Sequence, residues 1–219
     1  MSILRRSSRR SLDPAGTSTL LSIVSVLLDY PTPDTVALYP DLIVRSRQLP
    51  AGGAADALTS FTVWWVALPA DEREQRYVAA FDFRRRTPLH LTYLTHGDTR
   101  NRGAALLQIK HVLLRHGYDI SSGELPDYLP LLLEFAADEP RGIRLLGSHR
   151  RSLELLRRSL ADFDDPFAPL IAAVLAVLPR LDDADLAAVV SLAAEGPPEE
   201  SVGLDVYQIE NASVSGARR

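Results

Sequence analysis

The stretch LTSFTVWWVAL, residues 58–68, decides the fold class of this chain. Its large apolar side chains recur at steps of three and four residues, which places them on one face of an α-helix. A second stretch, FAPLIAAVLAVL at residues 167–178, repeats this spacing. The positions that we expect to be buried are Leu58, Phe61, Thr62, Trp65 and Leu68, and then Phe167, Leu170, Ile171, Val174, Leu175 and Leu178. The same period over the rest of the chain predicts an all-α fold, a single helical bundle domain of about eight to ten helices.

The sequence also indicates where helices begin and end. Thr87-Pro88 and Asp165-Pro166 each combine a side-chain acceptor with a proline, so we expect a helix to begin at each. Gly97 and Gly117 are expected to end helices, because glycine accepts the left-handed conformation that commonly closes a helix. Thr17-Ser18-Thr19 is the start signal that we assign to the first helix.

The two ends of the chain differ in composition from its middle. Arg5, Arg6, Arg9 and Arg10 lie among serines near the start. The segment SRRSL at residues 8–12 resembles the start of a twin-arginine export signal, but no small-residue cleavage site follows the apolar residues after it. We expect a flexible basic tail at 1–16, a helical domain at 17–195, and a disordered tail at 196–219, which opens with Gly-Pro-Pro.

Composition excludes several classes of protein. The chain has 219 residues, 46% of them hydrophobic, and no cysteine, so a disulfide scaffold and a thiolate metal site are excluded. A formal net charge of -4 is the wrong sign for a protein that binds the phosphate backbone of a nucleic acid. The longest uncharged apolar stretch, residues 20–28, is about half of the ~20 residues that a membrane-spanning helix needs. We expect a cytoplasmic protein with no nucleic-acid partner and no stable membrane insertion.

Motifs for catalysis are missing from the sequence. No two of the 5 histidines are three or four residues apart, the spacing that would place two metal ligands on one helix face. The chain has no G-x-x-x-x-G-K, G-x-G-x-x-G or G-x-S-x-G motif. We therefore expect no catalytic residue, no metal and no cofactor. An enzyme that acts through His96, Asp98 and the nearby arginines is kept as an alternative.

Three segments are more particular than a helical bundle requires. In YVAAFD, Tyr77 and Phe81 are four residues apart on one helix face and Asp82 follows them. The alternative role of the two aromatic side chains is core packing. In HGDTRNRG, His96, Asp98, Arg100 and Arg102 form a polar junction between two helices.

Within that junction, Asp98 can cap the following helix. Arginine in a first helical turn opposes the helix dipole, so an acidic partner is expected for Arg100 or Arg102, and that partner can come from the same chain.

The third segment, ELPDYLPLLLEF at residues 124–135, uses two prolines to fix the start of an apolar helix. Glu124 and Asp127 lie beside that start. The alternative role of Asp127 is to cap the helix.

Together these segments resemble the NarJ branch of the TorD/DmsD family, the delta-subunit chaperones of respiratory nitrate reductase. LLDYP at residues 27–31 is similar to the family's opening L-L-x-Y-P, and HGDTRNRG at residues 96–103 to its H-G-[DE]-S-R-x-R-G. ELPDYLPL at residues 124–131 is similar to its E-L-P-D-[HY]-L-P-L. The resemblance runs from about residue 20 to 135 and more loosely to 195. Thr99 replaces the usual serine, and Tyr128 stands where much of the wider family has histidine.

The resemblance implies a TorD-like, all-helical cytoplasmic chaperone that is not an enzyme. Its client would be the N-terminal segment of the apo nitrate reductase alpha (catalytic) subunit, which it would hold for molybdenum cofactor insertion and enzyme assembly. Molybdenum cofactor delivery proteins are further expected partners. The residues that the resemblance places in a peptide-binding groove are Tyr77, Phe81, Asp82, Glu124, Asp127, Tyr128 and Leu131.

Two further hypotheses stand beside the nitrate reductase chaperone. The alternative function is a helical adaptor that binds another amphipathic or signal-like peptide. The chain's own basic start imitates the segment that the groove would bind, which suggests mild autoinhibition.

Overall fold

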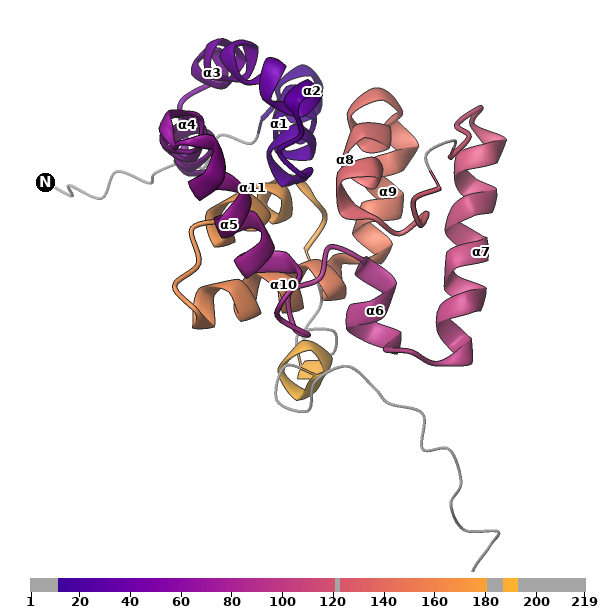
Figure 1. Ribbon diagram of the computed structural model, residues 1–219. Helices are drawn as coiled ribbons and strands as arrows, with labels where there is room; N and C mark the ends of the chain where they lie inside the picture. The colour runs from indigo at the N-terminus through magenta and orange to yellow at the C-terminus, as the bar shows by residue number, and fades with distance from the viewer. Residues whose placement is uncertain (1–11, 121–122, 181–186, 193–219) are drawn as a thin grey trace, which may run out of the picture.

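The computed structural model describes residues 12–120, 123–180 and 187–192 (Figure 1). Over these ranges the chain is helical, with one isolated antiparallel bridge between His90 and Tyr128 and no named strand. Nine helices of the described part have at least nine residues, which confirms the expected all-α bundle. The helices are α1 (Pro14–Leu28), α2 (Pro33–Ala37), α3 (Tyr39–Gln48), α4 (Gly53–Ala67), α5 (Ala70–Phe81), α6 (Leu91–His96), α7 (Arg100–Arg115), α8 (Leu129–Asp138), α9 (Pro140–Ser148), α10 (Arg150–Asp162) and α11 (Ala168–Val177), and residues 187–192 are helical as well.

A side-chain acceptor followed by proline begins three of these helices. At Asp13-Pro14 the aspartate accepts a hydrogen bond from the Gly16 N–H at 2.7 Å. As a result α1 begins three residues before residue 17, and residues 14–16 belong to the helical part of the chain. Thr32-Pro33 and Glu139-Pro140 start α2 and α9 in the same way.

Neither of the two acceptor–proline pairs that the sequence suggested as helix starts, Thr87-Pro88 and Asp165-Pro166, begins a helix at its proline. Thr87-Pro88 begins no helix, because the buried Thr87 hydroxyl donates to the carbonyl of Ala80 and closes the end of α5 instead. The chain then continues without helical structure until α6. At Asp165-Pro166 the carboxylate accepts from the Phe167 N–H at 3.1 Å within a turn, and α11 begins only at Ala168.

The two expected glycine stops are confirmed. Gly97 follows α6 with φ of 56° and Gly117 follows the C-cap residue of α7 with φ of 83°. Both values lie in the left-handed region that favours glycine.

An aromatic cluster joins α4, α5 and α11 in the core. The Phe167 ring centroid lies 5.1 Å from Phe61, 5.0 Å from Trp65 and 4.7 Å from Phe81. Tyr77 packs on Phe81 at 5.0 Å. Ring pairs at these separations stabilise a core beyond the area they bury, by about 0.5 to 1.5 kcal/mol each. Of the positions expected to be buried in the two defining stretches, all are buried except half-buried Leu68, which follows α4.

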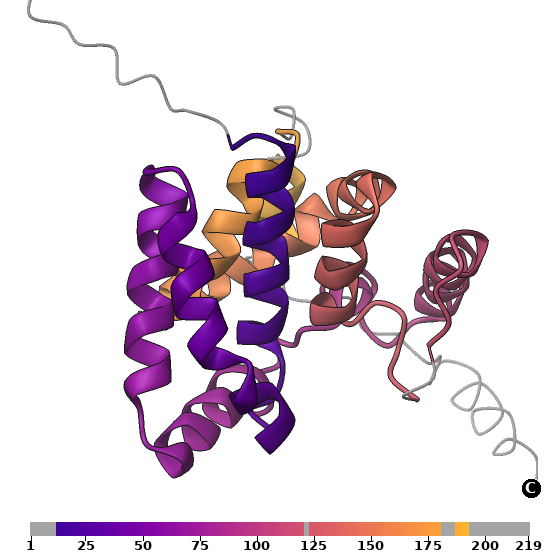
Figure 2. The ribbon, with the colours of Figure 1, turned by 90° about the horizontal axis from the view of Figure 1, so that it is seen from above.

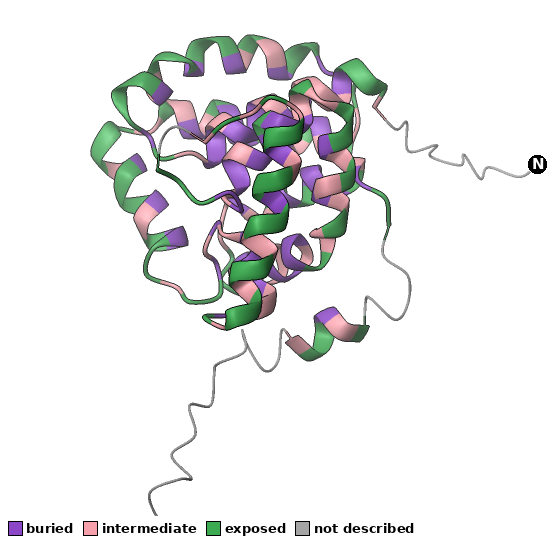
Figure 3. Cartoon of the chain, turned by 90° about the vertical axis from the view of Figure 1, so that its right-hand side faces the viewer, coloured by how far each residue is buried: buried purple, intermediate pink, exposed green. Residues whose placement is uncertain are grey.

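Helix α1 occupies the middle of the bundle. It packs against α8 on one side and against α3 and α4 on the other, with α11 also in contact (Figures 1 and 2). Helix α10 packs on α11 and α6, and α9 packs on α8. Helix α7 lies at the edge, where it buries Ile109 and Leu113 and exposes most of its surface (Figure 3).

Helices α8 and α9 approach each other very closely at one glycine. A Cβ atom on Gly142 would lie 2.4 Å from the Cα atom of Ala136. Glycine is therefore required here by the neighbouring backbone, because Gly142 itself lies within a helix.

Most of the two expected tails lies outside the described residues, which exclude 1–11 and 193–219. No helix within the described ranges is long and apolar enough to cross a membrane.

Candidate peptide-binding cleft

A cleft of about 540 Å³ lies between α1 and α8. Helix α1 contributes one face of side chains at a helical spacing of three and four residues, and α8 contributes the opposite wall. The lining residues are Ser22, Ser25, Val26 and Asp29 from α1 and its C-cap, Pro130, Leu131, Glu134, Ala137 and Asp138 from α8, and Thr35, Leu38, Glu124 and Tyr128 from the adjoining segments. We refer to this feature as the α1–α8 cleft.

Two side-chain hydrogen bonds fix α1 against α8. The buried Ser25 hydroxyl donates to the carbonyl of Pro130 at 2.8 Å, and the Ser18 hydroxyl donates to the carbonyl of Ala137 at 2.7 Å. Pro130 lies in the first turn of α8 and Ala137 in its last turn, so the two helices run antiparallel. Serine is small enough to allow this approach, and each bond also satisfies a polar group on an otherwise apolar helix.

A tyrosine pair lies at the α2 end of the cleft. The hydroxyl oxygens of Tyr77 and Tyr128 are 3.2 Å apart, and Tyr128 also donates to the Asp29 carboxylate at 3.1 Å. The Tyr77 hydroxyl lies 3.1 Å from the carbonyl of Leu28. Burial raises the pKa of both tyrosines, and the neighbouring carboxylates raise it further, so both hydroxyls stay neutral donors.

The cleft is acidic. Among its described lining residues are four carboxylates, Asp29, Glu124, Glu134 and Asp138, and no arginine or lysine. Val26 and Leu131 add apolar surface to the lining. The combination suits a segment that carries both apolar and basic side chains.

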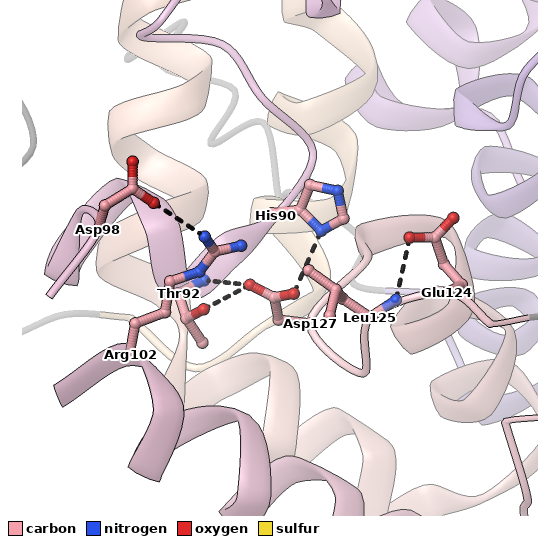
Figure 4. Close-up of polar contacts among 7 residues, drawn as sticks. All are labelled: His90, Thr92, Asp98, Arg102, Glu124, Leu125 and Asp127. Carbon is pink, nitrogen blue, oxygen red and sulfur yellow. Dashed lines mark hydrogen bonds and ion pairs between the residues drawn. The ribbon is translucent and has the colours of Figure 1, made fainter. Parts of the chain in front are cut away.

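Asp127 is fully buried behind the cleft and caps a helix distant in sequence. Its carboxylate accepts hydrogen bonds from the N–H of Thr92, at 3.0 Å, and from the Thr92 hydroxyl, and it lies 3.2 Å from Nδ1 of His90 (Figure 4). Thr92 is the second residue of α6, and the N-cap residue of α6, His90, forms no cap bond with its own side chain. Asp127 therefore acts as a cap, as the alternative role predicted, but for α6 rather than α8.

The hydrogen bonds of Asp127 also set its ionisation. Burial alone would raise the pKa of this carboxyl, but the bonds from His90 and Thr92 outweigh burial and the pKa lies below its usual value. The extended segments before α6 and α8 are joined by backbone bonds as well, from Leu91 N–H to the Asp127 carbonyl at 3.1 Å and from Leu129 N–H to the Leu89 carbonyl at 2.8 Å.

His149 lies near the same group. Burial lowers its pKa, Asp127 opposes that shift and His96 adds to it. Its neutral form is therefore favoured in the folded protein.

The polar junction forms contacts within the chain. Arg102 pairs with Asp98 at 3.2 Å and lies over the ring of Tyr93, 5.5 Å from its centroid. The expected acidic partner of Arg102 is therefore Asp98. Asp98 itself does not cap α7, because Thr99 is the N-cap residue and no side chain bonds there. His96 ends α6 and Arg100 begins α7, and neither lines the α1–α8 cleft.

The residues that the family resemblance placed in one groove lie in several environments. Glu124, Tyr128 and Leu131 line the cleft, and Tyr77 contacts Tyr128 beneath it. Phe81 is buried in the aromatic cluster, where the core-packing role holds.

Asp82 is exposed at the C-cap of α5, close enough to raise the pKa of Tyr77. Asp127 has its carboxylate oxygens directed to partners in its own chain. The peptide-binding role of the groove residues stays a prediction, but for Asp127 these contacts favour the alternative role as a helix cap.

Sequence reasoning missed three of the four carboxylates of the lining and all of the α1 wall. Asp29, Glu134 and Asp138 were not selected, although Asp29 lies within the LLDYP motif. A signal was present, because Ser22, Ser25 and Asp29 repeat at helical spacing in a stretch that is otherwise apolar from Leu20 to Leu28.

This arrangement of helices matches a known structure. A crystal structure described as a redox enzyme maturation protein from Archaeoglobus fulgidus aligns with a TM-score of 0.55 at 18% identity, over 72% of this chain and 91% of that one. The chain therefore has the all-helical fold of that class of protein.

Sequence comparison defines the family. The nitrate reductase delta subunit family matches residues 47–173, and the chain belongs to this family. NarJ of Bacillus subtilis strain 168 is 31% identical over 162 residues, covering 73% of this chain and 88% of that protein. The nitrate reductase molybdenum cofactor assembly chaperone NarJ of Escherichia coli K12 is 35% identical over 127 residues, covering 55% and 52%. The nitrate reductase-like protein NarX of Mycobacterium tuberculosis H37Rv is 37% identical over 152 residues, covering 68% of this chain and only 23% of NarX.

Proposed function

We propose that this chain is a cytoplasmic assembly chaperone for nitrate reductase that binds the N-terminal segment of the apo alpha subunit in the α1–α8 cleft. By holding that segment, it keeps the alpha subunit competent for molybdenum cofactor insertion and for assembly. The chaperone itself performs no catalytic step and carries no cofactor.

The observation that carries the proposal is the composition of the cleft. Four carboxylates and the apolar side chains of Val26 and Leu131 line the cleft, and no arginine or lysine is among its described lining residues. An amphipathic peptide with basic residues meets both requirements, since its apolar side removes cleft surface from water and its cations pair with the rim.

Family membership supports the same client. The E. coli relative is a nitrate reductase molybdenum cofactor assembly chaperone, and the family match at 47–173 includes α8 and the residues of the tyrosine pair. The cleft residues Glu124, Tyr128 and Leu131 fall within that match.

Calorimetric titration with a synthetic peptide of the first 20 residues or so of the cognate alpha subunit tests the proposal. The cleft variant combines Glu134→Gln with Asp138→Asn, two exposed residues whose replacements keep their shape. Each exposed ion pair is commonly worth about 0.2 to 1 kcal/mol, so the double variant, which loses two, should bind about two- to thirtyfold more weakly. Leu131→Gln should weaken binding too, with no change of charge.

A matched control removes two negative charges away from the cleft. Glu74→Gln lies on α5 and Asp162→Asn is the last residue of α10, just as Asp138 is the last residue of α8. The control should bind as tightly as the natural chain. Equal losses in both double variants would show nonspecific charge attraction and overturn the cleft assignment.

The same titration separates the adaptor alternative. A chaperone dedicated to nitrate reductase should bind its cognate peptide at least tenfold more tightly than a twin-arginine signal peptide of an unrelated redox enzyme. Equal affinity for both peptides would favour the adaptor.

A further inference from the structure

The start of α1 lies at one end of the α1–α8 cleft. Asp13 caps the helix, and the Ser18 hydroxyl holds the first turns of α1 to the carbonyl of Ala137 in the last turn of α8. Ala137 and Asp138 line the cleft at that end. Figure 2 shows α1 and α8 side by side along this length. The chain that precedes Leu12 is therefore tethered next to the acidic rim.

The tether is long enough to reach most of the cleft. From Asp13 to Asp29, α1 rises about 24 Å at 1.5 Å per residue. An extended segment covers about 3.3 Å per residue, so Arg5, seven residues before Leu12, can lie about 23 Å away from it. Arg9 and Arg10, two or three residues from Leu12, can lie no more than about 10 Å from it.

The charges of this segment complement the cleft. Residues 1–11, MSILRRSSRRS, hold four arginines and no acidic residue, and Ile3 and Leu4 supply an apolar part. The cleft lining holds four carboxylates around Val26 and Leu131. The segment thus carries the same two chemical features that the proposed client requires.

We propose that residues 1–11 bind in the α1–α8 cleft of their own chain and compete there with the client peptide. This inference rests on the proposed function for the identity of the competitor, but the contact between segment and cleft is a separate claim. The client displaces the segment, so the chaperone is occupied by its own start until a tighter-binding segment arrives.

The size of the competition follows from the tether. A short flexible connection gives an effective concentration in the millimolar range. If the free segment had a Kd of ~0.2 mM and the effective concentration were ~1 mM, the client would bind about sixfold more weakly than to an open cleft. A weak contact is therefore sufficient to produce a measurable effect.

The test uses the full-length chain and a four-arginine variant, Arg5→Ser, Arg6→Ser, Arg9→Ser and Arg10→Ser. This variant leaves Asp13 and Pro14 in place, so the start of α1 is kept. The alpha-subunit peptide should bind the variant several-fold more tightly than the natural chain at physiological salt. The synthetic peptide MSILRRSSRRSL, added to the variant, should bind with a submillimolar Kd and compete with the client.

A second comparison distinguishes binding in the cleft from charge repulsion between residues 1–11 and the basic client peptide. It uses the cleft double variant with and without the four-arginine change. When Glu134→Gln and Asp138→Asn are present, the four-arginine change should no longer improve client affinity, because the segment has lost its site. A gain that persists in this background overturns the inference, and so does an unchanged client affinity in the four-arginine variant.

Failure of the two proposals can be told apart. If the client binds the natural chain and the four-arginine variant equally, the inference fails and the proposed function stands. If no protein binds the client but MSILRRSSRRSL binds the variant and not its cleft-substituted form, the self-contact stands and the proposed function fails.

Discussion

Replacing Asp127 with asparagine should destabilise the protein and leave the peptide affinity of the α1–α8 cleft unchanged. Asparagine keeps the shape of the side chain but offers one acceptor oxygen and one NH2 donor in place of two acceptor oxygens. The carboxylate has 0% exposure and accepts from the Thr92 N–H at 3.0 Å while lying 3.2 Å from Nδ1 of His90. The amide oxygen can replace the acceptor at Thr92, and the NH2 group then faces His90.

The magnitude follows from the bonds that lose their charge. A hydrogen bond to a charged group contributes about 1.5 to 3 kcal/mol, whereas a neutral one contributes about 0.5 to 1.5 kcal/mol. Weakening the two bonds from Thr92 and altering the one at His90 should together cost about 1 to 3 kcal/mol. Asp127→Ala removes every acceptor and leaves a buried N–H of α6 unpaired, so it should cost more, about 3 to 5 kcal/mol.

The pH dependence has a definite sign. The folded pKa of Asp127 is lowered from its ordinary value of 3.8, so its carboxylate stabilises the folded state above that value, and the contribution is lost as pH falls through the folded pKa. The difference in unfolding free energy between the natural chain and Asp127→Asn should therefore shrink at strongly acidic pH.

Urea unfolding followed by circular dichroism measures the stability, and peptide titration at 10 °C, where the variant stays folded, measures binding. We expect Asp127→Asn to bind the peptide with the affinity of the natural chain and to have an unfolding free energy lower by about 1 to 3 kcal/mol. A variant with unchanged stability and tenfold weaker peptide binding would refute the reasoning, because it would place the carboxylate at the ligand. Glu134→Gln serves as a control with the opposite result: its peptide affinity should fall and its unfolding free energy should stay unchanged.

Other expectations concern single positions away from the cleft carboxylates. Gly142→Ala should lower the unfolding free energy by about 1 to 3 kcal/mol, because its Cβ would meet the backbone of α8, although alanine is the better helix former. Gly103→Ala, in α7 with nothing within 4 Å of its Cβ, should raise the unfolding free energy by about 0.5 to 1 kcal/mol in the same urea unfolding assay. Burial gives His149 a folded pKa below the ordinary value of 6.5, so stability should fall as pH is lowered through about 6.5, and His149→Gln should flatten this part of the pH profile in urea titrations. Ser25→Ala should cost about 1 kcal/mol in urea unfolding, because it leaves the Pro130 carbonyl without its 2.8 Å bond.

Helical periodicity predicted the core because the buried faces of α4 and α11 are set by local spacing alone. The rule that pairs an acceptor with proline is equally local, and it holds at Asp13-Pro14 and Thr32-Pro33. It fails at Thr87-Pro88, where the threonine hydroxyl donates a hydrogen bond to the carbonyl of Ala80 near the end of α5. Competition from a partner of that kind cannot be read from a dipeptide.

The candidate site was harder to predict for a related reason. Glu124, Tyr128 and Leu131 belong to one continuous motif, so sequence similarity finds them together. Asp29 and Glu134 come from helices whose facing sides are set by packing, and an isolated acid on a helix resembles any solvated residue. Asp127 was equally hard to predict, because it precedes α8 in the sequence but caps α6.

The pairing of α1 with α8 has a consequence for how the protein is made. The bonds from Ser25 to Pro130 and from Ser18 to Ala137 join residues that are 105 and 119 positions apart. At a synthesis rate of ~5 to 20 residues per second, the ribosome needs on the order of 5 to 25 s to deliver α8 after α1. During that interval α1 exposes a leucine-rich face that is completely buried in the finished protein. The folding rate should therefore be limited by closure of this long loop rather than by formation of the helices.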